Sequence, residues 1–248
     1  MTMSELTKVR IILVEPAGAL NVGSVARVMK NMGLQQLVLV KPHCNVLGQE
    51  AIQMAVHATD VLKQALVVES LPEALKGCQR AIATTARSRT LPLTLEQPRN
   101  ALPWLLTEAG ESALIFGPED RGLSNAELGL AQRFVCIPAN PEYPSLNLAQ
   151  AVAVCVYELY QISQEEFDSP TLAETVDSDT ATLDALENYY QHLEAILLKI
   201  GYLYPHTATK RMEKLRRLYN RSALSKQELA MLRGILRQIE WALQAKKE

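Results

Sequence analysis

The chain of 248 residues is 48% apolar and 21% charged, a composition typical of folded globular proteins, with room for one large domain or a medium domain and a small appendage. No segment approaches the run of about eighteen apolar residues that crosses a membrane, and the first ten residues lack the apolar core of a signal peptide, so we expect a cytoplasmic protein without a membrane partner. The net charge of −2 conceals an asymmetry, because residues 205–248 hold eleven Lys and Arg against four Glu (+7), whereas the first 204 hold 14 basic and 23 acidic groups (−9).

Short apolar runs alternate with helical patterns along the first two thirds of the chain. Strands are expected at 10–14, 37–40, 65–69, 81–85, 113–116 and 134–138, and helices at 22–32, 51–65, 72–76, 102–109, 125–131 and 148–160. Strands separated by helices pair in parallel and leave helices on both faces of the sheet. The pattern therefore predicts an α/β domain over residues 1–162.

A second unit follows an acidic segment rich in Ser and Thr, residues 163–182, which is typical of a linker. Residues 183–248 carry three amphipathic patterns, at 183–204, 209–219 and 225–243, the last opening with Ser225 and Glu228 spaced as a capping box. We expect a small all-helical domain there. Its basic charge favours an anionic partner, although a run of charge is often only a solvated face.

The loop after the first strand contains GALNVGSV, residues 18–25. Its two glycines are spaced as in a phosphate-binding P-loop, but Ser24 stands where the lysine should be, which disfavours that interpretation. Asn21 suits an N-cap and Gly33 the position after the helix end. Arg27 lies opposite the apolar stripe of this helix, so it is either an ordinary surface arginine or a residue at the ligand-binding edge of the sheet.

Two later loops also follow buried strands. Gly117 comes directly after a strand, where a glycine allows close backbone contact with a ligand, while Ser124 and Glu127 have capping-box spacing. The segment 136–147 has three prolines before Ser145 and Asn147, which restrict the loop; either of these two residues could be only an N-cap.

Several kinds of site are disfavoured. The four Cys and four His show no ligand spacing, so we expect no metal and reduced, mostly buried thiols. There is no G-x-G-x-x-G after the first strand, as a nicotinamide-dependent oxidoreductase would have, and no G-x-S-x-G nucleophile elbow.

Three motifs taken together carry a resemblance: N-x-G-S-x-A-R at 21–27, F-G-x-E-x-x-G-L-S at 116–124 and N-P-x-Y-x-S-L-N-L at 140–148. They resemble the signature motifs of the SPOUT superfamily of methyltransferases, in its TrmH-like 2′-O-methyltransferase branch, over roughly residues 9–160. The resemblance implies a C-terminal trefoil knot, S-adenosyl-L-methionine as cofactor, a homodimer with each active site completed near the interface, and methylation of a ribose 2′-hydroxyl. Together with TTARSRT (84–90) and the helical extension, it points to tRNA as substrate, at cytidine or uridine 32 of the anticodon loop.

The resemblance also implies roles for particular residues. Arg27 would act as an electrostatic clamp, with Ser145 and Asn21 positioning the nucleotide. Cofactor contacts would come from Thr84, Thr85, Ala86, Gly117, Ile137, Pro144, Ser145, Leu146 and Asn147. RNA contacts would come from Arg27, Lys210, Arg211, Lys214, Arg216, Arg217 and Arg221. Pro118 and Pro144 depart from the residues that many relatives carry.

Two alternatives remain beside this hypothesis. A 2′-O-methyltransferase for ribosomal RNA or for another tRNA position would share the same motifs. A non-catalytic RNA-binding relative would keep the fold, but the intact Asn21, Arg27, Glu119, Ser145 and Asn147 argue against it.

Overall fold

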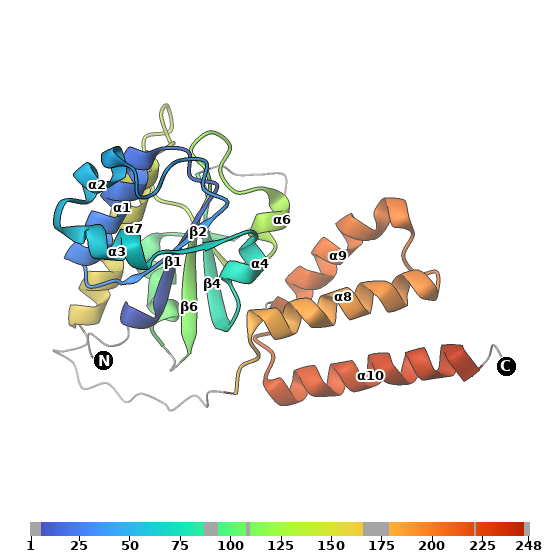
Figure 1. The fold of residues 1–248 in the computed structure, drawn as a ribbon. Coiled ribbons are helices and arrows are strands. Elements are labelled where there is room, and N and C mark those ends of the chain that lie inside the picture. The colour runs from blue at the N-terminus through green and yellow to red at the C-terminus, as the bar shows by residue number, and fades with distance from the viewer. Residues whose placement is uncertain (1–5, 87–93, 108–109, 166–178, 221, 246–248) are drawn as a thin grey trace.

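A computed structural model describes residues 6–86, 94–107, 110–165, 179–220 and 222–245. Its centre is a parallel sheet of seven strands (Figure 1) in the order β3-β2-β1-β6-β4-β7-β5. The strands are β1 Val9–Val14, β2 Gln36–Val40, β3 Leu66–Val68, β4 Cys78–Thr84, β5 Leu95–Glu96, β6 Glu111–Phe116 and β7 Arg133–Val135. Each neighbouring pair is parallel, which confirms the predicted α/β class.

Helices cover both faces of the sheet, as predicted. One face packs against α1 Ala19–Asn31, α2 Gln49–Ala55, α3 Thr59–Gln64, α5 Pro98–Ala101 and α7 Leu148–Glu165, with the 3-10 turns η1 Leu6–Lys8, η2 Val56–Ala58 and η3 Leu102–Leu105 beside them. The other face carries two single-turn helices, α4 Leu71–Ala74 and α6 Asn125–Leu128. These two are too short to cover a seven-stranded sheet alone.

The remaining cover comes from the C-terminal unit of three helices, α8 Leu183–Lys199, α9 Pro205–Asn220 and α10 Lys226–Ala245. The middle helix of this unit, α8, contacts both others and also packs against α4 and β4 (Figure 1). One hydrophobic cluster runs without interruption from the sheet through α4 into these helices. The Gly77 amide also donates to Asp184 Oδ1 at 3.0 Å, and Asn220 Nδ2 donates to the Gly129 carbonyl at 3.4 Å.

Some predicted elements differ in extent. The helix expected at 51–65 is three pieces, because Val56 adopts a positive φ of 53° that interrupts it. The helix expected from residue 22 begins at Ala19, and α7 continues through Glu165, beyond the expected domain end at 162. The two-residue strand β5 was not predicted. In place of the helix expected at 102–109, the structure has the short helix α5 followed by the 3-10 turn η3. The expected linker 163–182 lies mostly outside the described residues.

The first helix ends as the sequence predicts. Gly33 has a φ of 74°, and its amide donates to the Lys30 carbonyl while Leu34 donates to Met29, the pattern of a Schellman motif. Both predicted capping boxes, Ser124–Glu127 and Ser225–Glu228, form. None of the described helices is long and apolar enough to cross a membrane.

Candidate active site

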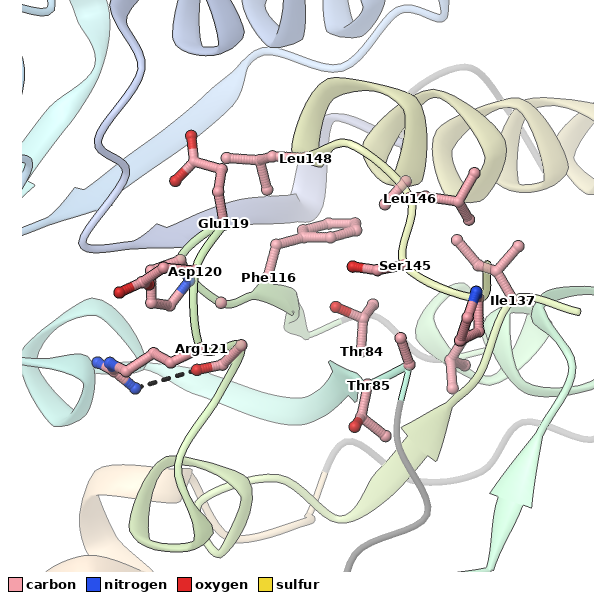
Figure 2. Close-up of a pocket in the computed structure, with 17 residues that line it drawn as sticks. Thr84, Thr85, Phe116, Glu119, Asp120, Arg121, Ile137, Ser145, Leu146 and Leu148 are labelled. Carbon is pink, nitrogen blue, oxygen red and sulfur yellow. Dashed lines mark hydrogen bonds between the residues drawn. The ribbon is translucent and has the colours of Figure 1, made fainter. Parts of the chain in front are cut away.

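A pocket opens where the carboxyl ends of β6, β4 and β7 lie side by side (Figure 2), the edge at which open α/β sheets bind ligands. Its empty volume, part of it open to solvent, is about 770 Å³, within the range of small-molecule sites. The lining residues come from three loops and the start of α7: Thr84, Thr85, Ala86, Phe116, Gly117, Pro118, Glu119, Asp120, Arg121, Gly122, Val135, Ile137, Pro144, Ser145, Leu146, Leu148 and Ala151.

Eight of the nine residues expected to contact the cofactor line this pocket: Thr84, Thr85, Ala86, Gly117, Ile137, Pro144, Ser145 and Leu146. Asn147 does not line it. Sequence reasoning missed the apolar wall formed by Phe116, Val135, Leu148 and Ala151. A signal was present, since these residues end strands or begin a helix beside the motifs.

Gly117 shapes the pocket by letting two stretches of backbone touch. A Cβ there would lie 2.3 Å from the Leu123 amide nitrogen and 2.5 Å from the Gly122 carbonyl carbon. No side chain fits at those distances, so the loop 117–122 folds tightly only with glycine at this position.

The hydroxyl groups of the pocket differ in availability. Thr84 Oγ1 donates to the Ile115 carbonyl at 2.9 Å, and the Thr85 amide donates to the Val135 carbonyl at 2.9 Å, so this segment is held by the neighbouring strands. The Ser145 hydroxyl points into the cavity toward Phe116 and Thr84 (Figure 2). Ser145 is thus placed to meet a bound molecule.

Asn21 joins the three motifs. Its Nδ2 donates to Glu119 Oε1 at 2.9 Å, and its Oδ1 accepts from Asn147 Nδ2 at 3.0 Å. The expectation that Asn21 caps the first helix is wrong, because the helix begins at Ala19 and Gly18 occupies the cap without a side-chain bond. Asn147 performs the capping role at α7, where its Oδ1 accepts from the amide of Ala149 at 2.9 Å.

Glu119 occupies the approach to the start of α1. Its carboxylate accepts hydrogen bonds from the amides of Ala17 and Gly18, at 3.1 and 3.3 Å. Partial burial opposes the ionised form, but these bonds and the one from Asn21 outweigh its effect and lower the pKa of Glu119. The backbone at the start of the stretch that resembles a P-loop therefore binds a carboxylate from the second motif.

An ion-pair network fixes the far end of the loop 117–122. Arg121 donates to Glu15 Oε2 at 2.7 Å and to both carboxylate oxygens of Glu127, at 3.0 and 3.1 Å. Hydrogen bonds to Glu127 and Glu15 raise the pKa of Arg121, which keeps it charged. The guanidinium of Arg121 therefore stabilises the conformation of this loop.

Arg27 lies on the exposed face of α1, opposite the buried Val22, Val25, Ala26 and Met29, as its spacing predicts. Within the described part of the chain it has no hydrogen-bond or ion-pair partner, and it does not line the pocket. Gly23 lies in α1 rather than in a loop. A Cβ there would lie 2.2 Å from the Ala51 carbonyl oxygen, so this glycine serves the close crossing of α1 and α2, not the approach of a nucleotide.

The basic residues of α9 fall into different environments. Lys210 and Lys214 are exposed and have no partner among the described residues. Arg211 donates to the Tyr202 carbonyl at 2.8 Å, and Arg217 donates to the Glu213 carbonyl at 3.3 Å. Arg221 lies outside the described residues.

Arg216 differs from these neighbours. It forms a two-bond ion pair with Glu187, in which both side chains are under one-fifth exposed. Its Cζ also lies 4.7 Å from the ring centroid of Tyr190. Arg216 thus holds α9 to α8, a structural task that the sequence pattern did not reveal.

Metal-binding side chains do not gather anywhere in the described ranges, where no three His, Cys, Asp or Glu residues are placed to share an ion. Cys78 and Cys155 are buried and Cys44 and Cys136 half-buried, all as free thiols.

Comparison with protein families explains this arrangement. Residues 8–157 match the model described as the SpoU rRNA methylase family, and residues 184–248 match the model of the tRNA methyltransferase TrmJ C-terminal domain. The chain belongs to the SpoU methylase family. The resemblance seen in the three motifs is thereby confirmed, and the C-terminal helices have a family counterpart of their own.

Relatives cover almost the whole chain. The tRNA (cytidine/uridine/adenosine-2′-O-)-methyltransferase TrmJ of Pseudomonas aeruginosa is 44% identical over 243 residues, which cover 93% of each chain. The crystal structure of TrmJ from Z. mobilis ZM4 aligns with a TM-score of 0.82 at 34% identity, covering 93% of this chain and 98% of that one. The SpoU methyltransferase AviRb from Streptomyces viridochromogenes, solved with the cofactor AdoMet, shares the fold at a TM-score of 0.51 and 20% identity.

Proposed function

We propose that this protein transfers a methyl group from S-adenosyl-L-methionine to a ribose 2′-hydroxyl of tRNA in the cytoplasm, at cytidine or uridine 32 of the anticodon loop. The observation that carries the proposal is the junction of the three motifs beside one pocket, where Asn21 joins Asn147 to Glu119, a residue of the pocket lining. The near full-length relative named for 2′-O-methylation of tRNA supports the substrate class. Position 32 rests on the motif resemblance.

The pocket suits the cofactor. An apolar wall of Phe116, Val135 and Leu148 offers a surface for an adenine ring, and Gly117 keeps the loop 117–122 tightly folded beside it. When bound, the cofactor supplies a methyl group already activated by its sulfonium charge. The chain therefore has to bind, orient and shield the reactants, tasks that need no metal ion.

Two residues act on the ribose in this proposal. Ser145 orients the 2′-hydroxyl from inside the cavity. Arg27 stabilises the negative charge that develops on the 2′-oxygen and holds the adjoining phosphate, because a guanidinium stays protonated and offers several donors. The exposed Lys210 and Lys214, with Arg211 and Arg217, contact phosphates away from the reacting nucleotide.

In a homodimer, Arg27 could reach the ribose even though it lies outside the pocket of its own chain. Arg27 lies outside the pocket of its own chain, on the solvent face of α1. Apolar side chains are exposed on α1 and on α7, which packs against it, with Leu20 of α1 51% and Tyr157 of α7 48% accessible. We propose that these helices form the dimer interface and that Arg27 serves the pocket of the second copy.

The strand order supports the trefoil knot that the family resemblance implies. β7 lies between β4 and β5, both of which precede it in the chain. Thr85 donates to Val135, and Cys136 donates to Glu96, each at 2.9 Å. We propose that the chain is threaded at this slot.

The deciding experiment incubates the purified protein with S-adenosyl-L-methionine and tRNA from a strain lacking the modification, then maps ribose methylation by nuclease digestion and mass spectrometry. A methyl group at position 32 is expected, with ribosomal RNA as the competing substrate. Methylation of ribosomal RNA alone, or of neither RNA, would refute the tRNA assignment.

Arg27→Ala should abolish methylation without loss of cofactor binding. Mixing it with a cofactor-binding variant such as Gly117→Ala tests the dimer, because half of randomly mixed dimers are hybrids with one intact site. At a cofactor concentration too low to fill the Gly117→Ala pocket, activity should return to about one quarter of the wild-type value. No recovery would show that Arg27 acts within its own chain.

A further inference from the structure

Tyr143 stands apart from the other aromatic residues. It lies in the loop 136–147 between β7 and α7, and its 80% exposure is the largest of any large apolar side chain described. Its ring contacts no other ring, and its hydroxyl has no hydrogen-bond partner, among the described residues. The function proposed above gives Tyr143 no task.

The backbone under Tyr143 is restrained. Pro141 and Pro144 flank it and fix their own φ angles. Asn140 closes the turn with both its backbone and its side chain. Its carbonyl oxygen accepts a hydrogen bond from the Tyr143 amide at 2.9 Å, and its Oδ1 accepts one from the Glu142 amide at 3.0 Å. An exposed ring on a restrained loop loses little backbone freedom when it binds a flat partner.

Tyr143 directly precedes two residues that line the pocket. Pro144 and Ser145, the next two residues, line the cofactor pocket, and two residues span at most about 7 Å of backbone. In-line transfer requires the 2′-oxygen within about 3.5 Å of the methyl carbon. The base is joined to C1′, the neighbour of C2′, which carries the reacting hydroxyl. The base of a nucleotide positioned for transfer therefore leaves the pocket within a distance comparable to the ~7 Å that separates Tyr143 from the pocket lining.

We propose that Tyr143 is a substrate-positioning residue that stacks on the base of the nucleotide being methylated. This inference rests on the proposed function. Proteins bind single-stranded RNA loops by stacking splayed bases on aromatic rings. Cytidine and uridine differ at their hydrogen-bonding edges but share a π face, so a stacking contact accepts both.

The test measures steady-state methylation of tRNA by the full-length protein and its variants. Tyr143→Ala should raise KM for tRNA by roughly 5- to 150-fold, the loss expected for one base–aromatic stack, while cofactor affinity measured by calorimetry stays unchanged. Tyr143→Phe keeps the ring and should restore KM to near the wild-type value. Glu142→Gln, on the same turn, is the matched control and should not raise KM.

A spectroscopic measurement reports the contact itself. A tRNA anticodon stem-loop with pyrrolocytosine at the target position should lose fluorescence on binding wild-type protein and Tyr143→Phe, but not on binding Tyr143→Ala. Equal KM for Tyr143→Ala and wild type, a parallel loss of cofactor affinity, or a changed oligomeric state would each overturn the inference. Absence of tRNA methylation by the wild type would instead refute the proposed function.

Discussion

At the scale of single residues, two glycines are fixed by the backbone that approaches them. Gly117 faces the amide of Leu123, and Gly23 faces the carbonyl of Ala51. Neither has a positive φ, so the constraint is lack of space rather than backbone conformation. One glycine shapes the pocket, and the other brings together the two helices beside it.

Gly117→Ala should therefore weaken cofactor binding by at least about tenfold, because the loop 117–122 must move away from the strand end to admit a methyl group. Calorimetric titration with S-adenosyl-L-methionine gives the measurement. Gly234→Ala in α10 is the matched control: its Cβ meets nothing within 4 Å. It should leave binding unchanged and stabilise the helix by about 0.5–1 kcal/mol.

Glu119 is the residue whose ionisation links the pocket to pH. Because its pKa is lowered in the folded state, its carboxylate stabilises the fold above the ordinary glutamate pKa of about 4.3, and this contribution is lost as pH falls through the folded-state pKa. Glu119→Gln should cost about 1 kcal/mol at pH 7, a modest value since the side chain is exposed.

Urea unfolding at pH 7 and at pH 4 tests this prediction. The difference between wild type and Glu119→Gln should shrink at the lower pH, whereas Glu50→Gln, which removes an exposed carboxylate on α2, should change little at either pH. A difference that is the same at both pH values would contradict a role for the ionised carboxylate.

At the scale of elements, the sequence predicted those helices and strands whose formation depends on residues close together in the chain. The six longer strands and the three C-terminal helices follow from apolar periodicity, and Gly33 from its place after a helix. The start of α1 is bound by Glu119, which lies about a hundred residues further along the chain. The residues around Asn21 therefore could not indicate that the helix begins before it. The two-residue strand β5 likewise depends on its pairing with β7, and the positive φ of Val56 has no signal in the sequence around it.

The same limit applies to α9, where a row of basic residues looked uniform. Arg216→Ala should destabilise the protein by about 2–3 kcal/mol, because it leaves the half-buried Glu187 unpaired. Burial alone would raise the pKa of Glu187, but the hydrogen bonds and the charge of Arg216 outweigh that effect and lower it. Lys210→Ala should leave stability within about 0.5 kcal/mol of wild type but weaken tRNA binding and flatten its salt dependence.

Thermal unfolding and tRNA titration at several salt concentrations distinguish these two effects. Equal effects of both substitutions on stability would show that Arg216 is not the buried partner of Glu187.

At the scale of the whole molecule, the two family matches meet in one hydrophobic core. Leu71 and Leu75 beside the sheet share a cluster with Leu183 and Leu186 of α8. Domains joined only by a linker unfold independently, whereas elements that share a core unfold together.

Calorimetry should therefore show a single unfolding transition for the full chain. A chain that stops at residue 178 should melt at a lower temperature and bind hydrophobic dyes, because apolar surface beside α4 becomes exposed. Two transitions, with the lower one matching the isolated helices, would mean that the units are energetically separate.

The shared core also limits how this protein can be divided or recombined. Attaching α8, α9 and α10 to a sheet without residues equivalent to Leu71 and Leu75 would leave Leu183 and Leu186 without their packing partners. A chimera made for new RNA specificity must carry α4 and its sheet face along with the helices. The unit that can be exchanged between proteins is therefore larger than the three C-terminal helices.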